Sequence, residues 1–291
     1  MAGRLEGKVA IVTGASQGLG LAIADAFVRA GASVVICSRS PEQLEARAVE
    51  LRALAGPGRS VGSIVADVSR SDEAKSVAAL ALTLCGRIDI LVNNAGVYGP
   101  MGAIDEVDWD AWVRALEINV LGSVLMAREA VRAMKRQGCG KIIQLSGGGA
   151  TNPMPLITAY ATSKAAIVRF AESLAEEVRE FGIDVNSIAP GALNTRMLEE
   201  ILSAGPERVG ASFFERAQRQ KENGGAGLLP GTELALFLGS DASNGITGKL
   251  ISAVWDAWPE WPAHVDELRN SDLFTIRRIV GADRGVTWGG K

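Results

Sequence analysis

Short runs of apolar, β-branched residues alternate along the chain with longer stretches in which apolar residues recur every three or four positions. The short runs are typical of buried strands and the longer stretches of amphipathic helices. Strands are expected at residues 8–13, 33–37, 61–65, 88–92, 183–188 and 248–254, and helices at 21–28, 41–54, 72–84, 112–134, 159–170, 197–202, 207–221 and 232–240. Because strands and helices alternate, we predict an α/β fold with a doubly wound Rossmann sheet of seven, mostly parallel, strands and helices on both faces.

Composition excludes several classes of function. A net charge of -3 indicates no basic surface for nucleic acid, and no window of 18 uncharged apolar residues predicts a membrane span. The first eight residues lack the apolar run of a signal peptide, and the three cysteines lack metal-like spacing, so a cytoplasmic protein with reduced thiols is expected. No metal site is expected, because His264 is the only histidine.

A glycine-rich turn follows the first expected strand. Gly14, Gly18 and Gly20 have the spacing Gly-x-x-x-Gly-x-Gly, and a helix follows at 21–28. Glycines let the backbone approach a pyrophosphate, whose charge then faces the helix N-terminus. A plain tight turn could have the same spacing, but the order strand, turn, helix favours a dinucleotide site.

The end of the second expected strand indicates which dinucleotide is preferred. NAD-binding folds hold the ribose 2′-hydroxyl with an acidic residue there, whereas this strand leads into Ser38, Arg39 and Ser40. Arg39 can pair with a 2′-phosphate and no carboxylate would repel it, so NADP(H) is favoured over NAD(H); alternatively, Arg39 is a solvated loop residue. Asp67, after the third expected strand, is interpreted as a helix cap, a contact to adenine, or both.

Tyr160 and Lys164 are four residues apart in a segment that can form a helix, so they would lie on one face. An ammonium beside a phenol favours the phenolate, so the tyrosine pKa is expected to fall from its usual value of about 10. Such a phenol can give or take a proton during a reaction. Taken alone, however, the pair is more typical of an ordinary helix surface than of a catalytic site.

Six motifs occur in order between about residues 8 and 255: Thr13-Gly14-Ala15-Ser16-Gln17-Gly18-Leu19-Gly20, Asp67-Val68, Asn93-Asn94-Ala95-Gly96, Ile118-Asn119-Val120, Tyr160 with Lys164, and Pro190-Gly191-Ala192-Leu193-Asn194-Thr195. In this order and spacing the chain resembles the single-domain branch of the short-chain dehydrogenases/reductases. The resemblance implies that Tyr160 is the general acid/base, that Lys164 lowers its pKa and holds the nicotinamide ribose, and that Asn119 positions a water in a proton relay. It also implies cofactor contacts from Gly14, Ser16, Gln17, Gly18, Leu19, Gly20, Ser38, Arg39, Asp67, Val68, Asn94, Ala95, Gly96, Tyr160, Lys164, Pro190, Gly191, Leu193 and Thr195.

The chain departs from the family at the catalytic serine, which usually stands 13 residues before the tyrosine, a position occupied here by Gly147. Three interpretations remain open. The favoured one is that a slip in the glycine-rich loop lets Ser146 reach the substrate. Otherwise Thr158, Asn152 or water supplies the hydrogen bond, or carbonyl reduction has been lost.

The last third of the chain is expected to differ from related chains. Residues 1–255 are interpreted as the catalytic domain, 196–229 within it as a lid over the substrate, and 256–291 as a tryptophan-rich extension that packs on the domain or joins subunits. The resemblance implies a homodimer or homotetramer acting on a small carbonyl or alcohol. We therefore expect an NADP(H)-dependent oxidoreductase that interconverts a carbonyl and a secondary alcohol. Because of Gly147, the alternative is a nucleotide-binding sensor or interaction subunit without turnover, and a lyase ranks last.

Overall fold

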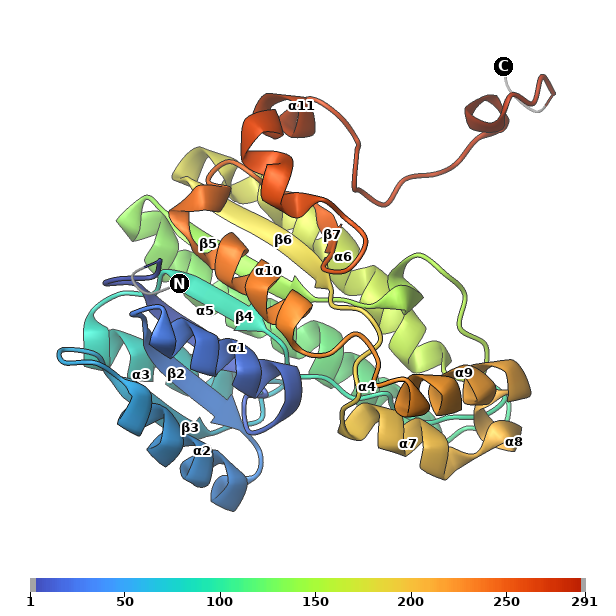
Figure 1. Ribbon diagram of the computed structural model, residues 1–291, viewed down its shortest axis with the longest axis horizontal. Coiled ribbons are helices and arrows are strands. Elements are labelled where there is room, and N and C mark those ends of the chain that lie inside the picture. The colour runs from blue at the N-terminus through green and yellow to red at the C-terminus, as the bar shows by residue number, and fades with distance from the viewer. Residues whose placement is uncertain (1–3, 289–291) are drawn as a thin grey trace.

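The computed structural model describes residues 4–288, and its centre is one parallel sheet (Figure 1). The strand order is β3-β2-β1-β4-β5-β6-β7, and each neighbouring pair is parallel. The strands are β1 (Val9–Thr13), β2 (Ser33–Ser38), β3 (Val61–Val65), β4 (Ile90–Asn93), β5 (Gly140–Leu145), β6 (Ile183–Ala189) and β7 (Leu250–Ser252). The prediction of a doubly wound sheet of seven parallel strands is confirmed.

Helices cover both faces of the sheet. The helices of the main body are α1 (Gly18–Arg29), α2 (Pro41–Leu54), α3 (Ser71–Cys85), α4 (Trp109–Leu116), α5 (Gly122–Gln137), α6 (Thr158–Val178) and α10 (Leu229–Gly239). Three further helices, α7 (Arg196–Ala204), α8 (Pro206–Val209) and α9 (Ala211–Glu222), lie together beyond one end of the sheet, and α11 (Val265–Arg269) belongs to the C-terminal extension (Figure 1). Among the described residues, no helix has the length and apolar character needed to cross a membrane.

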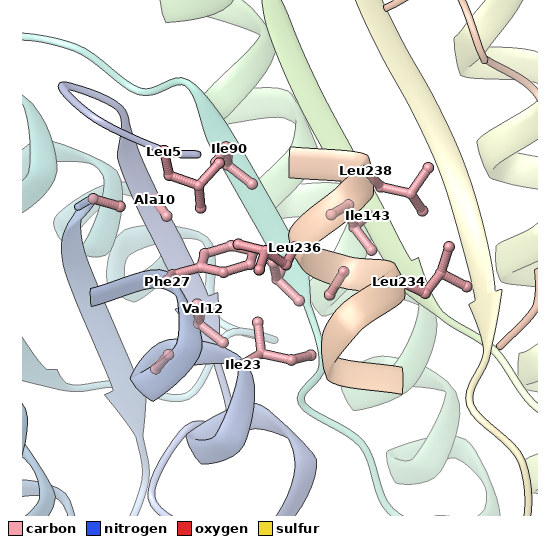
Figure 2. Packing of buried hydrophobic residues seen from close by; sticks show 14 of the residues in the cluster. Leu5, Ala10, Val12, Ile23, Phe27, Ile90, Ile143, Leu234, Leu236 and Leu238 are labelled. Carbon is pink, nitrogen blue, oxygen red and sulfur yellow. The ribbon is translucent and has the colours of Figure 1, made fainter. Parts of the chain in front are cut away.

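Alternating residues of each central strand supply two separate apolar layers. Ala10 and Val12 of β1 pack with α1, α2 and α10, whereas Val9 and Ile11 pack with α3, α5 and α6. Figure 2 shows the first layer, where Phe27 of α1 meets Leu236 of α10. Because the strands are buried on both sides, they read in the sequence as continuous apolar runs.

The order of the strands locates the site. Chain connections run from β1 outward to β3 on one side and from β4 outward to β7 on the other. The crevice outside the carboxyl ends of β1 and β4 is therefore the topological switch point, where ligands of such sheets bind.

Several boundaries differ from those expected. β4 begins at Ile90 because the Gln137 side chain hydrogen-bonds both the N–H (3.0 Å) and the C=O (2.8 Å) of Ile88. The expected helix at 207–221 is divided into α8 and α9 at Gly210, whose φ of +84° does not fit a helix. The long helix of the middle region contains a π-helical turn, Glu117–Leu121, which no feature of the sequence had indicated.

Part of the extension crosses the free edge of the sheet. The N–H of Leu250 in β7 donates to the Phe274 carbonyl (2.8 Å), and the Lys249 ammonium donates to the carbonyls of Ser271 (3.1 Å) and Leu273 (2.9 Å). We call residues 271–276 the strap. Beyond it, residues 277–288 run away from the sheet (Figure 1).

The tryptophans near the C-terminus differ in how deeply they are buried. Trp261 is buried in the main apolar layer, where its ring lies 4.4 Å from the ring of Phe274, and Trp258 packs on Phe237 with 5.2 Å between ring centroids. Trp255 is 84% exposed, so the packing of the extension on the domain does not include this side chain. A turn after β7, closed by the Ser252 N–H donating to the Asp256 carboxylate, directs Trp255 outward.

Candidate active site

One large cavity, about 1450 Å³ in volume, opens at the carboxyl ends of the strands. It brings together almost every residue expected at the site: Gly14, Ser16, Gln17, Gly18, Leu19, Ser38, Arg39, Asp67, Val68, Asn94, Ala95, Gly96, Ser146, Tyr160, Lys164, Pro190, Gly191, Leu193 and Thr195. Gly20 and Asn119 do not line it. The glycine-rich turn and the tyrosine–lysine pair therefore line the same cavity.

The turn after β1 is fixed by close backbone contacts. Gly14 has a φ of +64°, and a Cβ there would lie 2.8 Å from the Cα of Ala95. The Thr13 hydroxyl accepts the N–H groups of Asn94 (3.0 Å) and Ala95 (3.1 Å). The turn and the Asn-Asn-Ala-Gly segment therefore form one rigid wall at the N-terminus of α1, where a pyrophosphate would be stabilised.

Gly20 serves this wall without facing the cavity. The Asn94 side-chain amide donates to the carbonyls of Thr13 (2.9 Å) and Gly14 (3.1 Å). A Cβ at Gly20 would overlap that amide and lie 2.7 Å from the Gly14 carbonyl oxygen. The glycine provides the space for Asn94, so its expected contact with a cofactor is better described as support of the turn.

The cavity wall that follows β2 and β3 contains an exposed cation and a paired carboxylate. Arg39 is exposed at the cavity wall and makes no ion pair with any residue between 4 and 288, which suits it to a phosphate. Asp67 accepts hydrogen bonds from the N–H (3.1 Å) and hydroxyl (2.6 Å) of Ser69 and pairs with Arg114. Burial opposes ionisation of Asp67, but these partners outweigh it and lower its pKa.

The expectation that Asp67 caps the next helix is wrong. α3 begins at Ser71 after Arg70, and no side chain caps its N-terminus. Asp67 instead closes a local turn through Ser69 and holds Arg114 from the start of the long middle helix. Its position in the cavity wall leaves the adenine contact as a prediction.

Tyr160 and Lys164 lie on successive turns of α6 and line the same cavity. The buried Lys164 ammonium donates to the Leu145 carbonyl (2.7 Å) and lies 5.3 Å from the centroid of the Tyr160 ring. Burial lowers the pKa of Lys164 to about 8. Burial, with a smaller contribution from Tyr98, raises the pKa of Tyr160. The expected lowering of the tyrosine pKa is therefore not found in the protein alone, and Tyr160 is a neutral phenol at physiological pH.

Asn119 occupies the π-helical turn and works through its side chain. Its amide accepts the Val97 N–H (2.8 Å) and donates to the Val97 carbonyl (2.8 Å) and to the Ser163 hydroxyl (2.9 Å). Ser163 in turn donates to the Tyr160 carbonyl (2.7 Å). Asn119 therefore connects the segment after β4 to the helix that carries the tyrosine. Its expected place in a proton relay remains a prediction.

Gly147, and not Ser146, faces the tyrosine. A Cβ at Gly147 would lie 3.0 Å from the Tyr160 hydroxyl, so a side chain at this position would point at that group. Ser146 is 4% exposed, and its buried hydroxyl has no hydrogen-bond partner among the described residues. Adjacent residues at the end of a strand point to opposite sides. A slip that brings Ser146 to the substrate would have to change this backbone, and it remains a prediction.

Residues that the sequence did not single out complete the cavity. Tyr98, two residues beyond Gly96, places its ring 4.6 Å from the ring of Tyr160. The strap contributes Phe274 and Thr275, and Trp255 lies at the cavity wall. A tyrosine so close to a motif could have been noticed, but the strap depends on contacts that no local pattern encodes.

Helices α7, α8 and α9 form the remaining wall and have a small apolar cluster of their own. Leu198, Ile201, Val209 and Ala217 are buried together, with Tyr98, Met101 and Phe213 packed against them. The segment after α9 contains Gly224, Gly225 and Gly227, all with positive φ. We refer to α7–α9, which form most of residues 196–229, as the lid. Its movement remains a prediction.

Comparison with known proteins agrees with this geometry. Residues 8–205 match the family model for short chain dehydrogenases. The chain is 40% identical over 252 residues to the Escherichia coli oxidoreductase UcpA, covering 84% of this chain and 92% of that protein. It is 32% identical over 247 residues to the pig dehydrogenase/reductase SDR family member 4, covering 85% and 86%.

Solved structures of the same kind superpose on this fold. NAD+-bound xylitol dehydrogenase matches with a TM-score of 0.78 and 27% identity, over 86% of this chain and 98% of that one. Gluconate 5-dehydrogenase from Burkholderia cenocepacia, in complex with NADP and tartrate, matches with a TM-score of 0.75 and 28% identity, over 86% and 94%. The chain belongs to the short-chain dehydrogenase/reductase family and is an oxidoreductase by that membership.

Proposed function

We propose that the protein interconverts a carbonyl and a secondary alcohol, with NADP(H) as the cofactor and Tyr160 as the general acid/base. The observation that carries this proposal is that the glycine-rich turn and the Tyr160–Lys164 pair line one cavity. A dinucleotide spanning the cavity would place its nicotinamide near the phenol. The reduced nicotinamide would supply the hydride, and the protein would supply position and protonation.

The chain's own residues have separate tasks in this proposal. Tyr160, neutral because burial raises its pKa, donates its proton to the carbonyl oxygen during reduction. Lys164 is anchored on the Leu145 carbonyl (2.7 Å) and has further N–H groups for a ribose. Asn119 holds the surrounding backbone, and a place in a proton relay is proposed for it. Ser146 is kept as a polarising donor only if the backbone at Gly147 rearranges.

Preference for NADP(H) rests on Arg39. Its guanidinium lies at the cavity wall just after β2 and is free of carboxylate partners among residues 4–288. A guanidinium can hold a 2′-phosphate with two parallel hydrogen bonds. Because related proteins bind either dinucleotide, with NAD+ in xylitol dehydrogenase and NADP in gluconate 5-dehydrogenase, the preference has to be measured on this chain.

The test is turnover by the purified protein with cyclohexanone, diacetyl, dihydroxyacetone and acetoacetyl-CoA, each with NADPH and with NADH. We expect oxidation of NADPH with at least one carbonyl, and a kcat/KM for NADPH at least about tenfold above that for NADH, the effect of one charged contact. Tyr160→Phe should lower kcat by about 1000-fold or more, because it removes the proton donor and leaves the ring. The dissociation constant for NADPH should change less than about twofold.

A second function, a nucleotide-binding subunit without turnover, is motivated by Gly147, which leaves no hydroxyl opposite Tyr160. Both functions predict NADPH binding. Binding without oxidation of NADPH by any carbonyl, and a Tyr160→Phe variant that behaves as the parent does, would favour the second. Cytoplasmic location, a dimeric or tetrameric assembly and the division at residue 255 remain predictions of the family resemblance and the sequence.

A further inference from the structure

The Tyr160 hydroxyl, the proposed proton donor, belongs to a residue that lines the cavity. Negative charge develops on a carbonyl oxygen while its carbon is reduced, and a second donor aimed at that oxygen stabilises the transition state. Gly147 offers no side chain for this task, and the Ser146 hydroxyl is buried on the other side of the strand end. Asn152 lies on an exposed loop and bonds its neighbour Thr151 (3.0 Å).

Tyr98 is the polar side chain that lies against the proton donor. Its ring centroid is 4.6 Å from that of Tyr160, with 55° between the ring planes. Both rings line the same cavity. The rings are tilted and adjacent, so a substrate oxygen bound beside one phenol would lie near the other ring. Burial raises the pKa of Tyr98 to about 12, with a smaller effect of Glu200, so this phenol keeps its proton at physiological pH.

A chain of hydrogen bonds fixes the two tyrosines relative to each other. The Asn119 side chain accepts the N–H of Val97 and donates to its carbonyl, both at 2.8 Å, and so holds the peptide that leads into Tyr98. The same amide donates to Ser163 (2.9 Å), which donates to the Tyr160 carbonyl (2.7 Å). This arrangement gives the buried Asn119 a reason to be an amide, because its oxygen can accept the Val97 N–H while its nitrogen donates to the Val97 carbonyl.

We propose that the Tyr98 hydroxyl donates the second hydrogen bond to the carbonyl oxygen of the substrate, a task for which Gly147 has no side chain. The proposal rests on the proposed function. During reduction Tyr160 gives its proton to the oxygen, whereas Tyr98 keeps its own and only stabilises the developing charge. In alcohol oxidation Tyr160 accepts the hydroxyl proton of the alcohol, and Tyr98 again keeps its own proton.

Because Tyr98 and Tyr160 are the only tyrosines in the chain, two matched variants separate their roles. Tyr98→Phe keeps the ring and removes the hydroxyl. We expect kcat to fall by about 100-fold, the effect of losing one oxyanion donor, with the NADPH dissociation constant and the melting temperature close to the parent's. A kcat within about threefold of the parent would overturn the proposal and leave Tyr98 as a packing residue.

A spectroscopic measurement does not depend on the variants retaining activity. With tyrosine labelled at the phenol carbon with 13C, the protein gives two signals, which the two Phe variants assign. We expect the Tyr98 signal to move when the most active ketone of the panel is added to the protein with NADP+, which forms a complex that cannot turn over. A signal unmoved at saturating ketone would overturn the proposal.

Failure of this inference is distinguishable from failure of the proposed function. If Tyr160→Phe abolishes turnover while Tyr98→Phe leaves it intact, only the role of Tyr98 is wrong. If both variants retain turnover, the acid/base role of Tyr160 is wrong and the assignment of Tyr98 falls with it.

Discussion

The turn after β1 and the lid form opposite walls of the same cavity, but they are held in different ways. In the turn, backbone meets backbone: a Cβ at Gly14 would lie 2.8 Å from a neighbouring Cα, and side chains of Thr13 and Asn94 bond the main chain. In the lid, four buried residues form a cluster separate from the two main layers, and the ion pair between Lys221 and Glu199 is exposed. The wall proposed for the cofactor is therefore fixed by main-chain geometry, whereas the wall proposed for the substrate is made of side chains that can be exchanged.

The largest effect should come from a side chain placed where the turn has no space. Gly20→Val would force the Asn94 amide off the carbonyls of Thr13 and Gly14. We expect a loss of about 3–5 kcal/mol in the free energy of unfolding and a loss of NADPH affinity of at least about 100-fold. Urea denaturation measures the free energy of unfolding, and fluorescence titration with NADPH measures the affinity.

Gly56→Ala is the matched control, since a Cβ there meets nothing within 4 Å. It should leave both quantities within experimental error of the parent. Equal behaviour of the two variants would contradict the claim that the turn is sterically fixed.

The next effect is a dependence of stability on pH in which the buried lysine contributes a rise, whereas the buried Cys37 thiol, whose pKa burial raises from 9.0 to about 12, contributes a fall above about pH 9. Burial lowers the pKa of Lys164 to about 8 from the 10.5 of a free lysine. Between these values the lysine binds more protons in the unfolded chain than in the folded protein, so its contribution to stability rises with pH from about 8 to about 10.5. The rise should total about 3 kcal/mol, since one pKa unit corresponds to about 1.4 kcal/mol.

Lys164→Met should remove this rise, whereas Lys221→Met, at an exposed position of the lid, should retain it. Urea denaturation of the three proteins at intervals from pH 7 to pH 10 gives the comparison. A parent protein whose stability does not rise over this range would show that Lys164 is not held in an apolar site.

The smallest effect on global stability should come from the lid itself. Ile201→Ala removes apolar atoms from the separate cluster, which can open without unfolding the sheet. We expect the global free energy of unfolding to fall by less than about 1 kcal/mol, while the KM of the carbonyl rises by about tenfold and the NADPH affinity is unchanged.

Leu236→Ala in the main apolar layer is the contrasting variant. It should lower the free energy of unfolding by about 3 kcal/mol and leave the KM of the carbonyl near the parent value. If Ile201→Ala costs as much global stability as Leu236→Ala, the lid is part of the main cooperative unit and the comparison fails.

Sequence patterns predicted what is determined locally. The run from Val9 to Thr13 became a strand at the expected position, because buried β-branched runs between turns have few alternatives, and residues 61–65 became the less buried strand β3 where expected. The glycine spacing and the Tyr160–Lys164 interval indicated two parts of the cavity wall, because each depends only on residues close together in the chain. The family motifs then allowed 19 of the expected residues to be found along one cavity.

What the sequence did not predict depends on residues far apart in the chain. The hydrogen bond from Asn119 to Ser163 spans 44 positions, and the strap reaches back from Ile276 to Glu172 across 104. The predicted direction of the Tyr160 pKa shift was also wrong. The spacing of Tyr160 and Lys164 indicates a nearby cation, but it does not indicate how deeply the phenol is buried.

The strap has a consequence for how copies of this chain can meet. An outermost strand ordinarily offers its main chain to any extended segment that reaches it, which is a route to fibrous aggregation. In β7 the N–H of Leu250 already has an intramolecular acceptor in Phe274. Another extended segment could pair with this N–H only after displacing the strap, so the strap disfavours edge-to-edge pairing at this point of the sheet.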